Sequence, residues 1–136
     1  MEDCLFCKIA AGEIPSTKVY EDDHWFAFRD INPSAPVHVL LIPRQHVKNI
    51  LALTDETNKN FSDFFLVVKK IAEQEGLGDN GFRLVINTGA EAGQTVFHFH
   101  IHLIPRYEND NAGILWEPGE TTPEDMAEVK RLVDGE

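Results

Sequence analysis

Three histidines alternate with apolar residues in the segment His98-Phe99-His100-Ile101-His102. Successive side chains of an extended strand point to opposite faces, so this spacing predicts a row of imidazoles on one face and a packed core on the other. Solvent-facing strand positions usually carry threonine, lysine or glutamate rather than a run of imidazoles. Because imidazoles bind metals, transfer protons and attack electrophiles, the row predicts a site of chemistry.

A loop with two glycines, residues 87–95, leads into the histidine row. Its glycines allow backbone N–H groups to turn toward a ligand, and such loops can form anion-binding concavities. The side chains of Asn87, Gln94 and Thr95 add neutral hydrogen-bond donors. Alone, a glycine loop is usually only a turn. Beside an imidazole row, it favours a site where histidine attacks a phosphate and the donors hold the charge on its oxygens.

Cys4 and Cys7 have the spacing of half a tetrahedral zinc site. Two further ligands would have to come from elsewhere in the chain, and His46 and His98 are the candidates. The alternative is a pair of reduced core cysteines near the N-terminus. The cysteine spacing alone leaves both interpretations open.

Two other polar residues stand beside apolar segments. His38 is the one polar residue in the segment 37–42, where it is either a satisfied core histidine or a partner of the histidine row. Asp30 follows the aromatic segment 24–29, and it is either a turn-capping carboxylate or a group that pairs with sugar hydroxyls.

The elements expected to position these residues are strands at 17–20, 24–29, 37–42 and 82–86, followed by the histidine strand. A helix is expected from Thr54 to about Glu75, because its apolar residues recur at helical spacing and Gly76 follows. A short C-terminal helix begins at Thr122-Pro123. Two strand hairpins and a helix without β-α-β alternation predict an α+β fold with an antiparallel sheet.

The composition limits the class of protein. A chain of 136 residues with 43% hydrophobic content predicts one ordinary globular domain. Its net charge of −11 argues against nucleic acid and anionic membrane surfaces as partners. No apolar run reaches the roughly 20 residues of a membrane span, and the acidic start is not that of a signal peptide. We therefore expect a cytoplasmic protein with reduced cysteines.

Taken together, these residues resemble the histidine triad (HIT) family of nucleotide hydrolases and transferases. The family signature His-φ-His-φ-His-φ-φ, where φ is apolar, is matched by residues 98–104. Further segments resemble the Hint (histidine triad nucleotide-binding) branch, namely residues 4–9, 13–15, 28–33, 35–38 and 41–46. The resemblance implies a single HIT domain over residues 1–136, with a five-stranded antiparallel sheet, a long central helix and a short C-terminal helix.

The resemblance also implies catalytic roles. His100 would attack the α-phosphorus of a nucleotide and form a nucleotidyl-histidine, which water resolves to a nucleoside monophosphate. His102 would contact the phosphate and assist proton transfer, and His38 would orient the triad or relay a proton to it. A purine nucleotide would be bound at its base by Leu5, Phe6, Phe28 and Ile31, at its ribose by Asp30, and at its phosphate or leaving group by Asn87, Gly93, Gln94 and Thr95.

Two further properties follow from the resemblance. One is a structural Zn²⁺ bound by Cys4, Cys7, His46 and His98, a set of four protein ligands that leaves no open position for catalysis. The other is a homodimer that joins two sheets across a two-fold axis. The aromatic residues on several sides of the helix at 55–75 support this assembly, because they exceed what so small a sheet needs.

Branches of the family differ in the leaving group of the substrate that they cleave. The N-terminal half resembles the Hint branch and favours purine nucleoside phosphoramidates, that is, AMP or GMP conjugates. Residues 92–96 and 104–106 resemble the branch that hydrolyses dinucleoside polyphosphates, which is the first alternative. The second alternative is a non-catalytic AMP-binding or scaffold protein whose histidines only hold the nucleotide.

Overall fold

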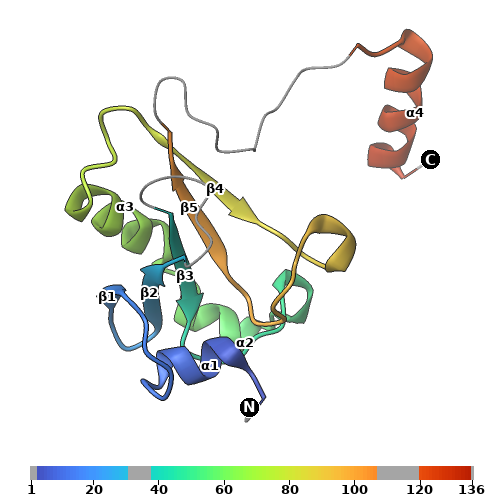
Figure 1. The fold of residues 1–136 in the computed structure, drawn as a ribbon. Coiled ribbons are helices and arrows are strands. Elements are labelled where there is room, and N and C mark those ends of the chain that lie inside the picture. Colours follow the sequence, from blue (N-terminus) through green and yellow to red (C-terminus); the bar gives the residue numbers. More distant parts are fainter. Residues whose placement is uncertain (1–2, 31–37, 107–119, 136) are drawn as a thin grey trace.

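The computed structural model of the chain describes residues 3–30, 38–106 and 120–135 (Figure 1). Five strands form one antiparallel sheet in the order β1-β2-β3-β5-β4, so β4 and β1 are its edges. This confirms the predicted α+β class. The strands are β1 Lys18–Glu21, β2 Trp25–Arg29, β3 Val39–Pro43, β4 Phe82–Ile86 and β5 Ile101–Pro105.

In the described residues, four α-helices and three 3₁₀ turns accompany the sheet. The helices are α1 Leu5–Ala10, α2 Asp55–Asn58, α3 Phe64–Gln74 and α4 Pro123–Asp134, and the 3₁₀ turns are η1 Ile50–Ala52, η2 Lys59–Phe61 and η3 Ala90–Ala92. The predicted C-terminal helix is confirmed as α4, with the Thr122 side chain capping its first turn. Helix α1 was not predicted, because six residues are too few to show a helical period.

The prediction of one continuous helix between residues 54 and 75 is wrong. Thr54 does begin a helix, through a capping box with Thr57, but α2 soon gives way to η2. Asp63 then leaves the helical conformation, with φ −94° and ψ 11°. Its carboxylate accepts a hydrogen bond of 3.1 Å from the Trp25 indole, and this tertiary contact accounts for the break between η2 and α3.

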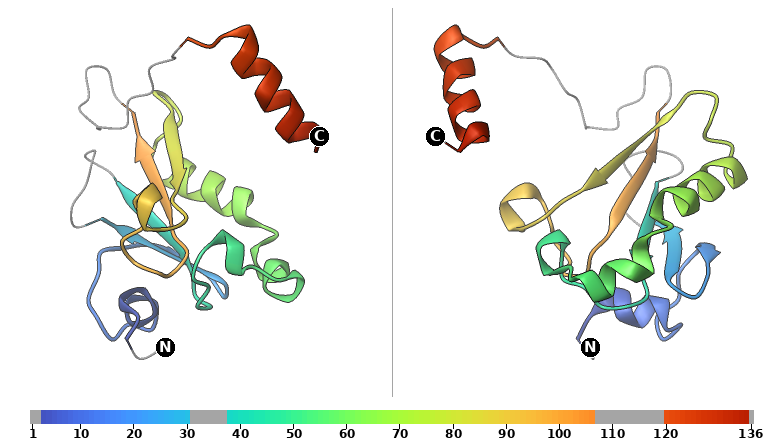
Figure 2. Two further views of the ribbon diagram at one scale, coloured as in Figure 1. Left: turned by 90° about the vertical axis from the view of Figure 1, so that its right-hand side faces the viewer. Right: turned by 180° about the vertical axis from the view of Figure 1, so that it is seen from behind.

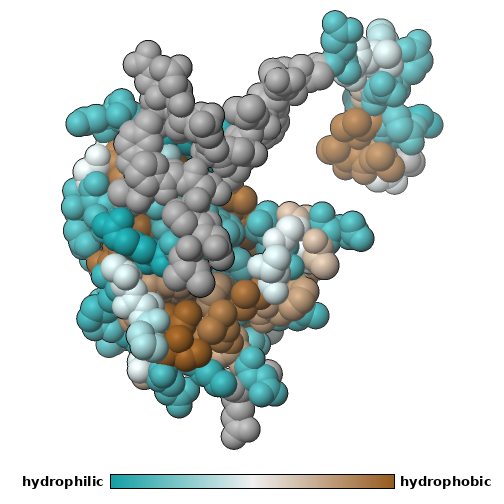
Figure 3. Space-filling view, viewed as in Figure 1, coloured by the Kyte–Doolittle hydropathy of each residue, from teal (hydrophilic) through white to brown (hydrophobic). Residues whose placement is uncertain are grey.

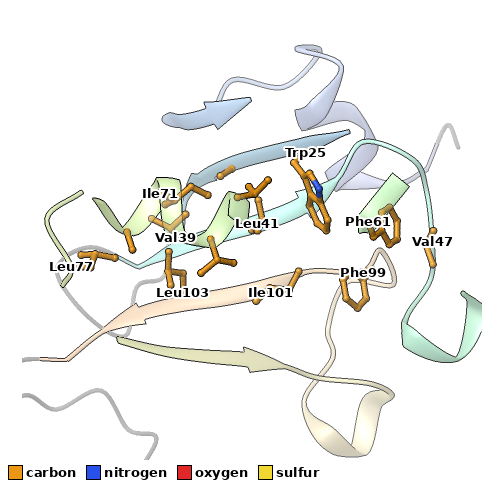
Figure 4. Packing of buried hydrophobic residues seen from close by; sticks show 14 residues of the cluster. Trp25, Val39, Leu41, Val47, Phe61, Ile71, Leu77, Phe99, Ile101 and Leu103 are labelled. Carbon is orange, nitrogen blue, oxygen red and sulfur yellow. The ribbon is translucent and has the colours of Figure 1, made fainter. Parts of the chain in front are cut away.

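The two faces of the sheet have different covers (Figure 2). Helix α3 covers one face and packs on Trp25, Leu41, Ile101 and other members of the larger core cluster (Figure 4). Helix α1 lies on the opposite face and packs through Phe6 and Ile9. Alternation along β2 and β3 divides their residues between these two layers, with Phe26, Phe28, Leu40 and Ile42 on the α1 face.

The histidine segment becomes a regular strand later than predicted. Pairing with the neighbouring strands begins at Ile101 rather than at His98. Before that point the Phe99 N–H donates to the Val47 carbonyl at 2.6 Å, so this backbone is held by a loop instead of a strand. The two-sided pattern is nevertheless confirmed, since Phe99, Ile101 and Leu103 lie in the core beneath α3.

Among the helices that the structure describes, none combines the length and apolar character needed to cross a bilayer.

Candidate active site and metal centre

A pocket of about 860 Å³ lies on the α1 face of the sheet. Phe6 and Phe28 form an apolar part of its wall, with their rings in an edge-to-face contact at 5.6 Å. Of the residues predicted to bind a nucleotide or catalyse, seven line this one pocket: Leu5, Phe6, Phe28, Asp30, Thr95, His100 and His102. Ile31, predicted to contact the purine, lies outside the described residues.

His100 is buried and held in one orientation. Its Nδ1 lies 2.7 Å from the His98 carbonyl oxygen. A carbonyl only accepts hydrogen bonds, so Nδ1 carries the proton and Nε2 keeps its lone pair. The Phe6 ring restrains the imidazole further, with an edge-to-face contact at 5.1 Å. Nε2 is therefore the ring nitrogen of His100 that this backbone contact leaves available to a ligand.

His102 is linked to His38 and Asp30. His38 Nε2 lies 2.9 Å from His102 Nδ1 and 3.6 Å from an Asp30 carboxylate oxygen. The carboxylate favours the tautomer in which His38 Nε2 carries the proton. His38 then donates to His102 Nδ1, which leaves the proton of His102 on Nε2. His38 is 4% exposed and does not line the pocket, so it contacts the pocket-lining His102 and not the pocket itself.

This arrangement favours neutral histidines. Burial lowers the pKa of His102 to about 4, and the two neighbouring imidazoles act in the same direction while Asp30 opposes them. Burial also lowers the pKa of His38, again against the effect of Asp30. His102 is consequently uncharged at neutral pH and can donate a hydrogen bond from Nε2 without carrying a positive charge.

We expect the stability of the protein to fall as the pH falls from about 6.5 to about 4. Histidine in the unfolded chain has a pKa of about 6.5, so in this range unfolded His102 binds a proton that the folded residue does not. Between pH 7 and pH 5 this difference costs about 2 kcal/mol. Urea unfolding at both pH values should show that His102→Gln loses less stability than the wild type.

His24→Gln is the matched control, because His24 is exposed in the turn before β2. It should keep the pH dependence of the wild type. An unchanged pH dependence in His102→Gln would contradict the assignment of a buried neutral imidazole.

The glycine loop differs from the predicted anion nest. The amides of Gly89, Gly93 and Gln94 all bond inside the loop, where Gly89 N–H donates to the Gln94 side chain and the other two close η3. The expectation that these amides turn toward a ligand is therefore wrong. The Gln94 side-chain amide donates to the carbonyls of Lys48 and Val96, at 2.8 and 3.2 Å, so this buried residue fastens the loop to its surroundings.

The remaining loop residues lie at the two ends of the turn. Thr95 is exposed and lines the pocket. Asn87 follows β4 and packs against Gly93, where a Cβ atom would lie 3.5 Å from Asn87 Nδ2. Neither Asn87 nor Gly93 lines the pocket in this conformation. Sequence alone indicated the polar types in this loop but not which of them face the pocket.

Cys4, Cys7, His46 and His98 form a second cluster, and their ligand atoms all lie within 4.8 Å of one another. His98 Nδ1 is 3.3 Å from Cys4 Sγ, 3.4 Å from Cys7 Sγ and 3.3 Å from His46 Nδ1. A tetrahedral Zn²⁺ with usual bond lengths has N–N edges of about 3.3 Å and S–N edges of about 3.5 Å. The four side chains thus have the dimensions of a closed zinc site.

The protonation of the cluster also suits a metal. His98 Nε2 donates to the Pro43 carbonyl at 2.8 Å, which leaves Nδ1 unprotonated and aimed at the cysteines. Burial lowers the pKa of His98 to about 4, so the imidazole stays neutral. Burial and the nearby Cys4 raise the pKa of Cys7 to about 11, a cost that a bound cation would remove. These four residues fit Zn²⁺.

Comparison with known proteins agrees with this fold. A family model described as the HIT domain matches residues 11–109. The chain is 43% identical over 137 residues to a protein named Protein hit of Bacillus subtilis, a match that covers 97% of this chain and 92% of that protein. The chain belongs to the HIT family.

Two other relatives carry more informative names. The purine nucleoside phosphoramidase of Escherichia coli K12 is 44% identical over 103 residues, which cover 76% of this chain and 87% of that enzyme. A crystal structure of a histidine triad nucleotide-binding protein from Candida albicans superposes with a TM-score of 0.81 at 34% identity. That superposition covers 98% of this chain and 96% of the other.

Proposed function

We propose that this protein is a Hint-like nucleotide hydrolase that cleaves purine nucleoside phosphoramidates at the α-phosphate. The observation that carries the proposal is the hydrogen bond from His100 Nδ1 to the His98 carbonyl, which leaves the Nε2 lone pair of a pocket-lining histidine available for attack. The name of the Escherichia coli relative supports the same activity.

The reaction would proceed in two displacements. His100 Nε2 attacks the α-phosphorus, an N–P bond forms, and the P–N bond to the leaving amine breaks while the amine takes up a proton. Water then attacks the nucleotidyl-histidine, which returns His100 and releases a nucleoside monophosphate. The covalent intermediate divides one difficult displacement into two easier ones.

His102 would assist both displacements. With its Nδ1 occupied by His38, its Nε2–H can donate to a phosphate oxygen or to the departing group. A neutral donor at this place stabilises the charge that develops on the phosphate oxygens. Asp30 would act on this pair by fixing the tautomer of His38.

The pocket also suits the rest of a purine nucleotide. The base would lie against Leu5, Phe6 and Phe28, which supply apolar and aromatic surface. Asp30 lines the same pocket and would accept hydrogen bonds from the ribose hydroxyls. Thr95 would donate to the phosphate, and Asn87 and Gly93 would reach it only after a change in the loop.

A substrate panel tests the leaving group. We expect adenosine and guanosine phosphoramidates to be hydrolysed with a kcat/KM at least tenfold above that of diadenosine tri- and tetraphosphate. The reverse order would favour the dinucleoside polyphosphate hydrolase that residues 92–96 and 104–106 suggest. Binding of AMP without any turnover across the panel would favour the scaffold protein instead.

We also propose that Cys4, Cys7, His46 and His98 hold one structural Zn²⁺. Four protein ligands leave no position for water, so the ion would tie α1 to the sheet rather than take part in the reaction. Phe6 lies between the two cysteines and contacts His100, so the metal would also fix one wall of the pocket. Reduced thiolates of this kind fit a cytoplasmic location.

A homodimer is proposed because apolar side chains surround the open edge strand β4. Phe82 and Ile86 of β4 are exposed on the face that α3 covers, and Phe65 of α3 is 75% exposed beside them. Monomeric proteins rarely leave a contiguous apolar surface along an unpaired strand. A two-fold pairing of β4 edges would bury this surface in both copies.

Phe65→Asp is expected to convert the dimer to a monomer. The substitution places a charge at the centre of the proposed interface, where its desolvation is costly. Light scattering at micromolar concentration should change from twice the chain mass to 15.4 kDa. Lys18→Asp, on the opposite edge strand β1, is the control and should leave the mass unchanged. A wild-type mass of 15.4 kDa at this concentration would contradict the proposed dimer.

A further inference from the structure

A second group of possible metal ligands lies beside the pocket, apart from the cysteine cluster. One ligand atom each of Asp30, His38 and His102 lies within 4.8 Å of the other two. Asp30 and His102 line the pocket, whereas none of the four residues of the cysteine cluster does. Two imidazoles and one carboxylate form a ligand set that divalent transition-metal ions use in proteins. These three residues are therefore a candidate cation site as well as a chain of hydrogen bonds.

The distances within this group suit adjacent ligands of one ion. Around an ion with bonds of about 2.1 Å, adjacent ligand atoms lie about 3.0 Å apart in an octahedron and about 3.4 Å apart in a tetrahedron. His38 Nε2 lies 2.9 Å from His102 Nδ1 and 3.6 Å from an Asp30 carboxylate oxygen. Both distances differ from these values by only about 0.2 Å or less, so small shifts of the side chains are enough to hold an ion.

Both imidazoles can offer a lone pair to an ion. Burial lowers the pKa of His38 and lowers that of His102 to about 4, so both rings are neutral near pH 7. His102 Nδ1 carries no proton when it accepts the hydrogen bond from His38. His38 can bind an ion as its other tautomer, with the proton on Nδ1. The ion then takes the place of the proton between the two nitrogens, and both rings stay neutral.

The surroundings favour a cation with open coordination positions. Three protein ligands leave positions that water or a ligand oxygen can fill, unlike the four ligands of the cysteine cluster. On the face shown in Figure 3, hydrophilic side chains border the hydrophobic patch in the lower part of the molecule. The chain has a net charge of −11, and a negative surface raises the local concentration of cations.

We propose that Asp30, His38 and His102 bind a divalent transition-metal ion such as Ni²⁺ or Co²⁺, and that the bound ion prevents nucleotide binding. Imidazole ligands favour these ions over Mg²⁺ and Ca²⁺. The ion occupies the carboxylate proposed to bind the ribose and the nitrogen through which His38 orients His102. Binding of the cation does not depend on the proposed hydrolase activity, whereas the competition rests on the proposed nucleotide site.

Calorimetry with Ni²⁺ on the zinc-loaded, full-length protein tests the site. The wild type should bind one Ni²⁺ in the pocket, and Asp30→Asn should bind it at least tenfold more weakly. Loss of an outer-shell partner of a metal ligand already costs about 10–100-fold in affinity, and Asp30 is proposed as a direct ligand. His24→Gln removes an exposed histidine in the turn before β2 and should match the wild type. Equal affinities in the wild type and Asp30→Asn would overturn the proposal.

Anomalous diffraction gives the position of the ion without any substitution. A crystal soaked in Ni²⁺ and measured at the nickel absorption edge should show a peak in contact with His38 Nε2, His102 Nδ1 and the Asp30 carboxylate. A peak only at the cysteine cluster or at exposed histidines would show that the ion binds elsewhere and would overturn the site. The absence of any peak would overturn it as well.

Competition with AMP tests the effect of the ion. Saturating Ni²⁺ should raise the AMP dissociation constant of the wild type at least tenfold, and the same Ni²⁺ concentration should change that of Asp30→Asn less than twofold. An AMP affinity of the wild type that Ni²⁺ leaves unchanged would overturn the competition. Failure of AMP to bind the protein without Ni²⁺ would instead contradict the proposed nucleotide site, and the Ni²⁺ measurements would still decide the cation site.

Discussion

Replacement of His100 by alanine should lower kcat for nucleoside phosphoramidate hydrolysis by about 10³-fold or more while AMP still binds. The substitution removes the nitrogen proposed to form the covalent intermediate, and His102, the other histidine of the pocket, has a different arrangement. His102 has its Nδ1 engaged by His38, and the tautomer set by Asp30 leaves a proton on its Nε2. Of the two histidines that line the pocket, only His100 has a ring nitrogen bonded to a backbone carbonyl, which leaves its Nε2 lone pair available for attack.

In His100→Ala, AMP binding should be retained while hydrolysis is lost. The pocket walls formed by Leu5, Phe6 and Phe28 are unchanged in His100→Ala, so the AMP dissociation constant should stay within about tenfold of the wild-type value. Calorimetry measures this constant, and steady-state hydrolysis measures kcat. His24→Gln, an exposed site, should match the wild type in both. Activity of His100→Ala within tenfold of the wild type would exclude His100 as the nucleophile.

A quenched single turnover gives independent support. With a radiolabelled adenosine phosphoramidate, the wild type should carry label on one peptide, the one that contains His100, and His100→Ala should carry none. A stable label on His102 or His38 would assign the covalent step to a different imidazole. An unlabelled wild type with full turnover would favour direct attack by water.

The alternation in the histidine segment was enough to predict which side chains share a face. His100 and His102 do line the pocket, while Phe99 and Ile101 enter the core. The start of the strand could not be predicted in the same way, because the Phe99 N–H is held by Val47, a residue distant in the sequence. Side-chain direction follows from local geometry, but strand pairing depends on tertiary contacts.

Tertiary contacts also explain the other differences. The break at Asp63 depends on a hydrogen bond to Trp25, 38 positions earlier in the chain. Gln94 was predicted as a ligand donor because an amide side chain can donate, but its donors are used by carbonyls of neighbouring segments. The residue type determines whether a side chain can donate or accept a hydrogen bond, but the fold determines which partner it bonds to.

The sequence pattern also could not predict which residues of the site contact one another. His38 stood out as a polar residue in an apolar strand, and Asp30 as a carboxylate after an aromatic one. Their spacing gave no sign that Asp30 and His102 would both approach Nε2 of His38. The distances of 2.9 and 3.6 Å from His38 Nε2 define a chain from Asp30 through His38 to His102.

The second prediction with a large expected effect concerns zinc binding by Cys4, Cys7, His46 and His98. Protein purified without chelators should contain about one Zn²⁺ per chain, and Cys4→Ser/Cys7→Ser should contain none. A ligand present at about 1,000 times its dissociation constant stabilises the folded state by about 4 kcal/mol. For a domain of this size, the double variant should therefore melt roughly 10–15 °C below the wild type.

Two controls separate metal loss from the effect of the substitutions. A chelator should lower the melting temperature of the wild type toward that of the double variant and should leave the double variant itself unchanged. Substitution with Co²⁺ should give the intense visible absorption of a tetrahedral thiolate site in the wild type only. Loss of zinc should also become easier as the pH falls, because the ligands must be thiolates and neutral imidazoles.

The proposed metal site can be separated from the proposed catalysis, because His98 belongs to the cysteine cluster and His100 lines the pocket. His98 Nδ1 is directed to the two cysteines, while the His98 carbonyl holds His100. Removing the metal should therefore act through position, since a displaced α1 moves Phe6 away from His100 and raises KM more than it lowers kcat. A double variant with the zinc content and melting temperature of the wild type would show that these four residues do not bind the metal.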